Sequence, residues 1–262
     1  MPDRQLLDHV PILGVVAGTF LLVLLAVELG FRLGRRRFNR PEHETEGPVG
    51  AMVGATLGLL ALLMAFTFSL AASRFDARRM VLLDESNAIG TAYLRADLIP
   101  EPHRTAVRDL LREYVDMRLE AARSLDASRT LTRSAELHTL IWEHVAAVGR
   151  DNPGSITAGL FVQSINDVID LHAKRAMLAL RNRIPSSIWY VLYGIAIMSL
   201  GTMGYHAGLA GTRRSPGSLI VCAAFTAVMW LTLDLDRPQQ GMFRVSQQPM
   251  IELRESMVEP AR

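Results

Sequence analysis

The side chains that could do chemistry are few, and they stand at the ends of apolar segments. Asp234 and Asp236 lie beside Arg237 directly after one apolar run, and Glu28 precedes Arg32 by four residues near the end of another. The four-residue spacing places Glu28 and Arg32 on one helix face, where they can form an ion pair. An intramembrane carboxylate can also mark an ion path. Both interpretations of Glu28 stay open.

Enzyme signatures are absent from the sequence. It has no GxSxG, no HExxH, no P-loop and no GxGxxG after a strand. His138 and His144 are six residues apart on different helical faces, which favours structural roles. The single cysteine, Cys222, excludes an internal disulfide and a CxxC metal site. We therefore predict that the protein is not an enzyme and has no catalytic residue, no metal site and no cofactor.

Four apolar runs must position the charged groups. Val10 to Val27 has 18 uncharged residues, Val49 to Ala72 has 24, Ile184 to Thr212 has 29 and Ser215 to Leu233 has 19. A helix needs about 20 such residues to cross a bilayer. The runs predict a multi-pass membrane protein with four transmembrane helices and a lipid bilayer as its surroundings. A net charge of +2, with no basic run between aromatic residues, argues against nucleic acid as a partner.

The polar stretch between the second and third runs predicts an inserted helical domain. Apolar residues recur there with helical spacing, and no run alternates with period two, so we expect an all-α fold. The predicted divisions are residues 1–72 for two spans, 73–183 for the helical soluble domain, 184–235 for two more spans and 236–262 for a C-terminal tail.

The stretch from Val49 to Leu98 is predicted to be one continuous helix that leaves the membrane and continues into water. Between Ser73 and Arg79 there is no Gly, Pro or Asn to stop it. Small residues recur at every fourth position in two rows of its first half. One row is Gly50, Gly54 and Gly58, and the other is Ala61, Ala65, Ser69 and Ser73. Such rows let another helix approach closely in lipid. Helix packing is one interpretation of this face, and the lining of a pore is the other.

Basic residues near the span ends weakly favour cytoplasmic termini and a cytoplasmic central domain, in a cell (inner) membrane. Lys174 is the only lysine among 28 basic side chains. That bias indicates a GC-rich, bacterial coding sequence.

Residues 65–95, AFTFSLAASRFDARRMVLLDESNAIGTAYLR, resemble the bestrophin-like family of four-span membrane proteins, distant relatives of the bestrophin anion channels. The segment LDLDRPQQGMFRVSQQPM at residues 233–250 is similar to the same family. The resemblance implies a homo-oligomer, possibly a pentamer, whose second span lines a central pore.

Bestrophins narrow their pore with three apolar side chains four residues apart, upstream of an arginine–aromatic pair. Matching Arg74-Phe75 to that pair implies a pore constriction at Gly58, Leu62 and Phe66. Gly58 departs from the pattern because it is not bulky. The calcium-binding acidic run of eukaryotic bestrophins is reduced here to two aspartates, which argues against a calcium switch.

An apolar ring can gate by dewetting, and arginines at its mouth attract anions. Arg74, Arg78 and Arg79 are the predicted pore mouth. They could instead be interfacial anchors that pair with Asp76 or Asp84. The first hypothesis is therefore a channel for small inorganic anions. The second is a non-conducting membrane scaffold whose helical domain binds a partner.

Overall fold

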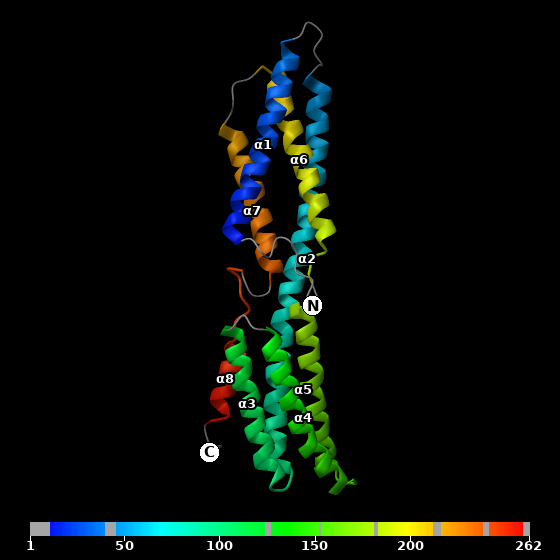
Figure 1. Ribbon diagram of the computed structural model, residues 1–262. Coiled ribbons are helices and arrows are strands. Elements are labelled where there is room, and N and C mark those ends of the chain that lie inside the picture. Colours follow the sequence, from blue (N-terminus) through cyan, green and yellow to red (C-terminus); the bar gives the residue numbers. More distant parts are fainter. Residues whose placement is uncertain are drawn as a thin grey trace. The chain divides into compact units, whose positions relative to one another are not determined.

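The computed structural model describes residues 11–39, 46–123, 127–151, 153–180, 183–211, 216–237 and 241–258. Within these ranges all regular structure is helical (Figure 1). The elements are α1 (Ile12–Phe38), α2 (Glu46–Arg95), η2 (Ala96–Leu98), α3 (His103–Arg123), α4 (Ala127–Asp151), α5 (Ile156–Leu180), α6 (Ser186–Leu209), α7 (Pro216–Asp236) and α8 (Gln248–Ser256). The all-α prediction is confirmed.

Four helices are long and apolar enough to cross a membrane: Ile12–Phe38, Gly47–Leu98, Ser186–Leu209 and Pro216–Asp236. They coincide with the four apolar runs, so the four predicted spans are confirmed as membrane helices by length and composition. The continuity of α2 through Ser73 is also confirmed, because the helix runs unbroken from Glu46 to Arg95.

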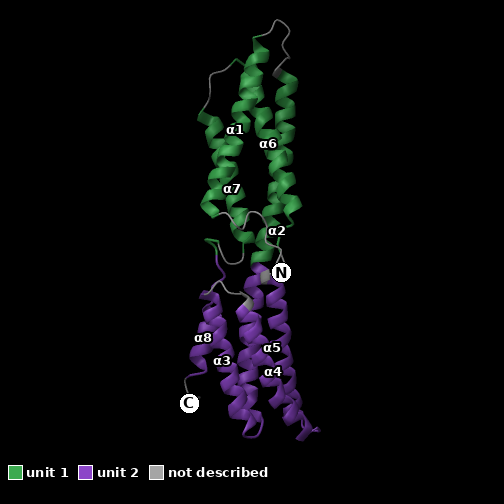
Figure 2. Ribbon diagram, in the orientation of Figure 1, with its two compact units in different colours: residues 1–75, 183–243 green, residues 76–182, 244–262 purple. Residues whose placement is uncertain are grey.

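The chain divides into two compact units (Figure 2). We call residues 1–75 and 183–243 the membrane unit, and residues 76–182 and 244–262 the helical unit. Helix α2 contributes to both. The residues from Arg244 onward also belong to the helical unit.

Closely packed glycines join α1 to α6 in the membrane unit. A Cβ placed on Gly30 would lie 1.9 Å from the carbonyl oxygen of Gly201, and one on Gly204 would lie 2.1 Å from that of Val27. Only hydrogen can occupy these positions, so the two backbones touch, as small residues permit in lipid. Thr19 and Tyr193 add a 2.7 Å hydrogen bond between the same helices.

The helical unit buries one stripe from each of its long helices. The apolar spacing predicted from sequence reappears as the core, in which these residues are at most 3% exposed: Val107, Leu111, Tyr114, Val115, Leu137, Ile141, Val145, Val148, Ile165 and Val168. Ser155 caps the start of α5, because its Oγ accepts the Ala158 N–H at 3.2 Å. Helix α8 completes this core with Met250, which is fully buried.

Candidate functional site: the exposed face of α2

The membrane half of α2 has two faces that its composition does not reveal, since both are apolar. One face packs against the core of the membrane unit through Leu57, Leu60, Leu63, Met64 and Ala71. The opposite face is exposed, and we call it the open face of α2: Gly54, Gly58, Ala61, Leu62, Ala65, Phe66 and Ser69. All of these belong to the residues predicted to line a pore or to pack against another helix.

The three residues of the predicted constriction lie together on this open face. Leu62 is 52% exposed and Phe66 is 64% exposed. A Cβ on Gly58 would meet no described atom within 4 Å. At 3.6 residues per turn, Leu62 and Phe66 are stacked about one turn apart along the helix. Two bulky apolar side chains, each more than half exposed, therefore project from a membrane helix.

The predicted packing row behaves differently at its two ends. A Cβ on Gly50 would lie 3.1 Å from Nε2 of His206, so the start of the row contacts α6. Gly54 and Gly58 have no described atom within 4 Å of such a Cβ. The close glycine packing of this chain is thus at α1–α6, and packing of the α2 row against another copy stays a prediction.

The three arginines of the predicted pore mouth have different environments. Arg74 Nη1 lies 3.8 Å from Asp236 Oδ1, and its side chain is only 16% exposed. This partner differs from Asp76 and Asp84, the two expected from sequence spacing. Arg78 is buried, at 8% exposed, and Arg79 is exposed. Of the three, Arg79 alone presents its side chain to the surroundings of the chain.

Asp236 organises the junction between α2, α6 and α7. Its carboxylate is fully buried, and Oδ1 accepts the Ile184 N–H at 3.0 Å. Arg183 Nε lies 3.7 Å from Oδ2. Together with Arg74, these contacts place one buried anion between two cations. The arrangement holds the last membrane turn of α2 against the start of α6 and the end of α7.

Asp234 holds the segment that follows α7. Its two carboxylate oxygens accept the backbone N–H groups of Met242 at 2.9 Å and Phe243 at 2.8 Å. Gly241 is needed beside it, because a Cβ there would lie 2.9 Å from the Asp234 carbonyl oxygen. Both carboxylate oxygens of Asp234 are therefore hydrogen-bonded to backbone donors. Its role here is that of an anchor.

A second buried carboxylate, Glu85, was not singled out by the sequence analysis. It lies in α2 and is fully buried, with Arg175 Nη1 bonded to Oε2 and Arg118 Nε 3.6 Å from Oε1. Tyr114 donates its hydroxyl proton to Oε1 at 2.8 Å. The sequence does indicate that Glu85 is unusual, because this acidic residue lies between Leu82 and Ile89 in an otherwise apolar helical stripe.

Two histidines complete this polar cluster in the helical unit. Tyr114 uses its only proton on Glu85, so the 3.0 Å contact with His172 Nδ1 requires Nδ1–H to donate. Burial, followed by the nearby Arg118 guanidinium, lowers the pKa of His172 to about 4. Burial also lowers the pKa of His138, whose ring centroid is 4.8 Å from that of His172. Both rings are therefore neutral at pH 7.

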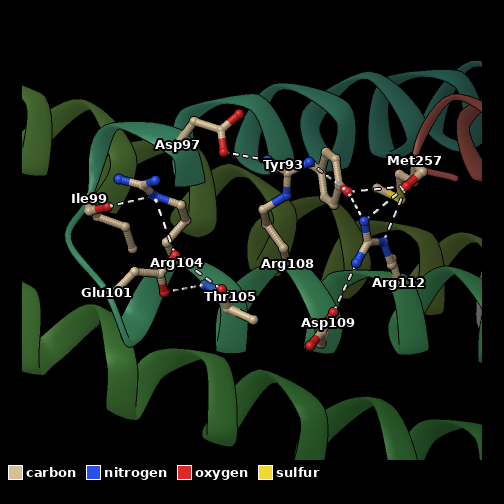
Figure 3. Close-up of polar contacts among 10 residues, drawn as sticks. All are labelled: Tyr93, Asp97, Ile99, Glu101, Arg104, Thr105, Arg108, Asp109, Arg112 and Met257. Carbon is tan, nitrogen blue, oxygen red and sulfur yellow. Dashed lines mark hydrogen bonds and ion pairs between the residues drawn. The ribbon is translucent and has the colours of Figure 1, made fainter. Parts of the chain in front are cut away.

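The end of α8 is hydrogen-bonded to its neighbouring helices through Tyr93 and two arginines (Figure 3). Tyr93 donates its hydroxyl proton to the Met257 carbonyl oxygen at 3.1 Å, and Arg112 donates to the same oxygen. Arg108 donates to the Tyr93 oxygen at 2.9 Å. These bonds fix the end of α8 on α2 and α3.

The family model for the bestrophin-like domain matches residues 17–250. The chain belongs to the bestrophin-like family. This confirms the resemblance carried by the two motifs, and the match includes α2, helices α3 to α5 and the segment held by Asp234. No match was found among curated proteins.

Solved structures share the bestrophin-like fold. One variant of a bacterial bestrophin homologue from Klebsiella pneumoniae matches with a TM-score of 0.68 at 16% identity, covering 95% of this chain and 96% of that one. A second variant of the homologue matches with a TM-score of 0.67 at 14% identity, covering 93% and 97%. At these identities the likeness establishes the fold.

Proposed function

We infer that the protein is a homo-oligomeric channel for small inorganic anions, with the open face of α2 lining its pore. The observation that carries the proposal is the pair Leu62 and Phe66, which are 52% and 64% exposed on a membrane helix. Bestrophins are anion channels, and this chain belongs to the bestrophin-like family and shares the fold of a bacterial bestrophin homologue. An apolar ring contributed by several copies would gate by dewetting.

Exposed apolar side chains support self-association in the part of α2 that belongs to the helical unit and in η2, which follows it. Met80 and Leu94 of α2 are 53% and 69% exposed, and Leu98 of η2 is 50% exposed. Apolar groups gathered on one long helix favour burial against a partner. A ring of identical chains, possibly a pentamer as in bestrophins, would cover them with equivalent surfaces.

Within this channel, the arginines have distinct roles. Arg79 is exposed and supplies positive charge that attracts anions to the pore. Arg74 is paired with buried Asp236, so it positions the pore helix rather than meeting the ion. We further propose that the helical unit and both termini lie in the cytoplasm of a bacterial cell with an inner membrane.

A non-conducting scaffold is the second candidate, favoured by the small residues of the same face. Gly54 and Gly58 have open space at their Cβ positions, and Ala61 and Ala65 are exposed. These residues would let a helix from another copy approach the α2 backbone closely. In that assembly the open face would be filled by protein and would leave no path for ions.

Anion flux from liposomes distinguishes the two candidates. In the channel, Phe66→Ala widens the ring, lowers the dewetting barrier and raises flux or removes its gating. In the scaffold, the same change removes packing, at a cost of about 3–5 kcal/mol by analogy with soluble cores, and flux stays absent.

Phe68→Ala is the matched control, because Phe68 is a half-buried phenylalanine on the opposite side of α2. It should leave flux as in the wild type. An intact oligomer that conducts in neither the wild type nor Phe66→Ala would rule out the channel.

A further inference from the structure

An apolar groove lies within the membrane unit, between α1, α6 and the start of α7, and its volume is about 800 Å³. Leu21 and Leu25 line it from α1, Ala207 from α6 and Leu219 from α7. The three leucines are 63%, 55% and 48% exposed, so the groove opens to the surroundings of the membrane helices. Hydrocarbon is the medium that such a groove meets in a bilayer.

Positive charge is concentrated beyond one end of the groove. Glu28, a lining residue, accepts a hydrogen bond from Arg32 Nε at 2.7 Å. The Arg32 side chain is nevertheless 63% exposed. Arg36 follows one turn later on the same face, and Arg35 and Arg37 flank it in the last turn of α1. This part of α1 therefore carries one carboxylate and four guanidinium groups, which leaves an excess of positive charge.

We propose that this groove binds one anionic phospholipid, with an acyl chain in the groove and the phosphate on Arg32 and Arg36. The apolar lining matches the chain, since each buried methylene contributes about 0.8 kcal/mol. Guanidinium groups bind phosphate oxygens through paired charge-assisted hydrogen bonds. The excess positive charge selects a lipid with net negative charge over a zwitterionic one. This site does not depend on whether the protein conducts ions.

Native mass spectrometry of the detergent-released oligomer tests the site. The protein is mixed with equal amounts of phosphatidylglycerol and phosphatidylcholine that carry the same acyl chains. We expect phosphatidylglycerol to be retained preferentially. Arg32→Gln with Arg36→Gln should remove that preference and weaken phosphatidylglycerol binding by about fivefold per arginine, since a basic residue near an anionic membrane surface contributes about 1 kcal/mol.

The groove is tested separately by filling it. Ala207→Phe should lower the retention of both lipids, because its ring occupies the space of the acyl chain. Met198→Phe is the control, since Met198 is on the same helix, is 70% exposed and does not line the groove. It should retain lipid as the wild type does. The oligomer mass, measured in the same spectra, reports whether each variant is folded.

Two outcomes would overturn the proposal. Equal retention of the two lipids by the wild type, unchanged in the arginine double variant, would mean that no phosphate site exists. A second copy of the chain could occupy the groove instead. Oxidation of Leu25→Cys in a Cys222→Ser background would then give disulfide-linked dimers, whereas a lipid-filled groove gives none.

Discussion

At the residue scale, two buried carboxylates share one arrangement. Asp236 in the membrane unit lies between Arg74 and Arg183, and Glu85 in the helical unit lies between Arg118 and Arg175. Both acids are 0% exposed. A buried ion pair adds little net stability, but removal of one partner is costly because the other charge stays buried. Each carboxylate therefore offsets the repulsion between the two guanidinium groups beside it.

Replacing Asp236 should destabilise the membrane unit. Asp236→Asn keeps an oxygen for the Ile184 N–H but leaves Arg74 and Arg183 without their counter-charge. We expect a loss of about 3–5 kcal/mol, seen as a lower midpoint of thermal unfolding in detergent. The control is Asp76→Asn, at an exposed position of α2. Equal midpoints for the two variants would show that the Asp236 contacts do not stabilise the fold.

Acid should destabilise the helical unit through His172. The folded pKa of about 4 is below the unfolded value of 6.5. The unfolded state therefore binds more protons, and stability that is complete above about pH 6.5 is lost as pH falls toward 4. The charged or titratable groups around the ring are Glu85, Arg118, Arg175, Tyr114 and His138.

The measurement is the unfolding midpoint at pH 7.5, 6 and 5, followed by the fluorescence of Trp142 in a background where Trp189 and Trp230 are replaced by Phe. His172→Asn should flatten the decline toward low pH, because it removes the group that gains a proton on unfolding. His103→Asn, outside this cluster, should retain the wild-type decline. The same pH dependence in the wild type and His172→Asn would contradict the prediction.

At the element scale, glycines within a single helix have different roles. In α6, Gly201, Gly204 and Gly208 face α1, and a Cβ on Gly208 would lie 2.3 Å from the Phe31 carbonyl oxygen. Gly194 in the same helix has no described atom within 4 Å of its Cβ position. The same residue type thus provides backbone contact at one position and open space at another.

The pair Gly204→Ala and Gly194→Ala tests this difference within one helix. Gly204→Ala should destabilise by about 1–3 kcal/mol or more, because its methyl group would overlap the Val27 carbonyl oxygen. Gly194→Ala should be neutral or stabilising by up to about 1 kcal/mol, since alanine favours helix more than glycine. Thermal unfolding in detergent measures both. A neutral Gly204→Ala would mean that α1 and α6 are not in backbone contact.

At the scale of the whole molecule, the contacts of the open face of α2 distinguish the channel from the scaffold. Its residues combine two bulky side chains, Leu62 and Phe66, with glycines that have open Cβ positions. Membrane helices bury small residues against each other, and apolar rings gate pores. The channel and the scaffold differ in which of these residues meet a neighbouring copy.

Gly54→Leu should weaken the oligomer if a neighbouring copy packs on this row. Within the chain the new side chain meets no described atom at its Cβ, so the fold itself should persist. Native mass measurement should therefore show smaller assemblies that remain folded. Gly18→Leu is the control, because Gly18 is an exposed glycine of another membrane helix. An unchanged oligomer in Gly54→Leu would place the interface elsewhere.

The helices of this protein could be predicted from the sequence because their signals are local. Four uncharged runs predict the spans, and the 3.6-residue spacing of Val107, Leu111, Val115 and similar residues predicts the buried stripes. The absence of helix breakers near Ser73 was enough to predict the continuity of α2. Hydrophobic spacing and helix termination depend on near neighbours in the chain.

The pairing of charges required the tertiary structure. Arg74 has Asp76 two residues away, yet its partner is Asp236 from α7, because only the packed helices bring that carboxylate beside it. Glu85 looks like one acid in an apolar stripe until α3 and α5 place Arg118 and Arg175 around it. The membrane half of α2 is apolar on all sides, so composition could not separate its packed face from the face of Leu62 and Phe66. That division depends on which helices pack beside α2, and such contacts join residues far apart in the chain.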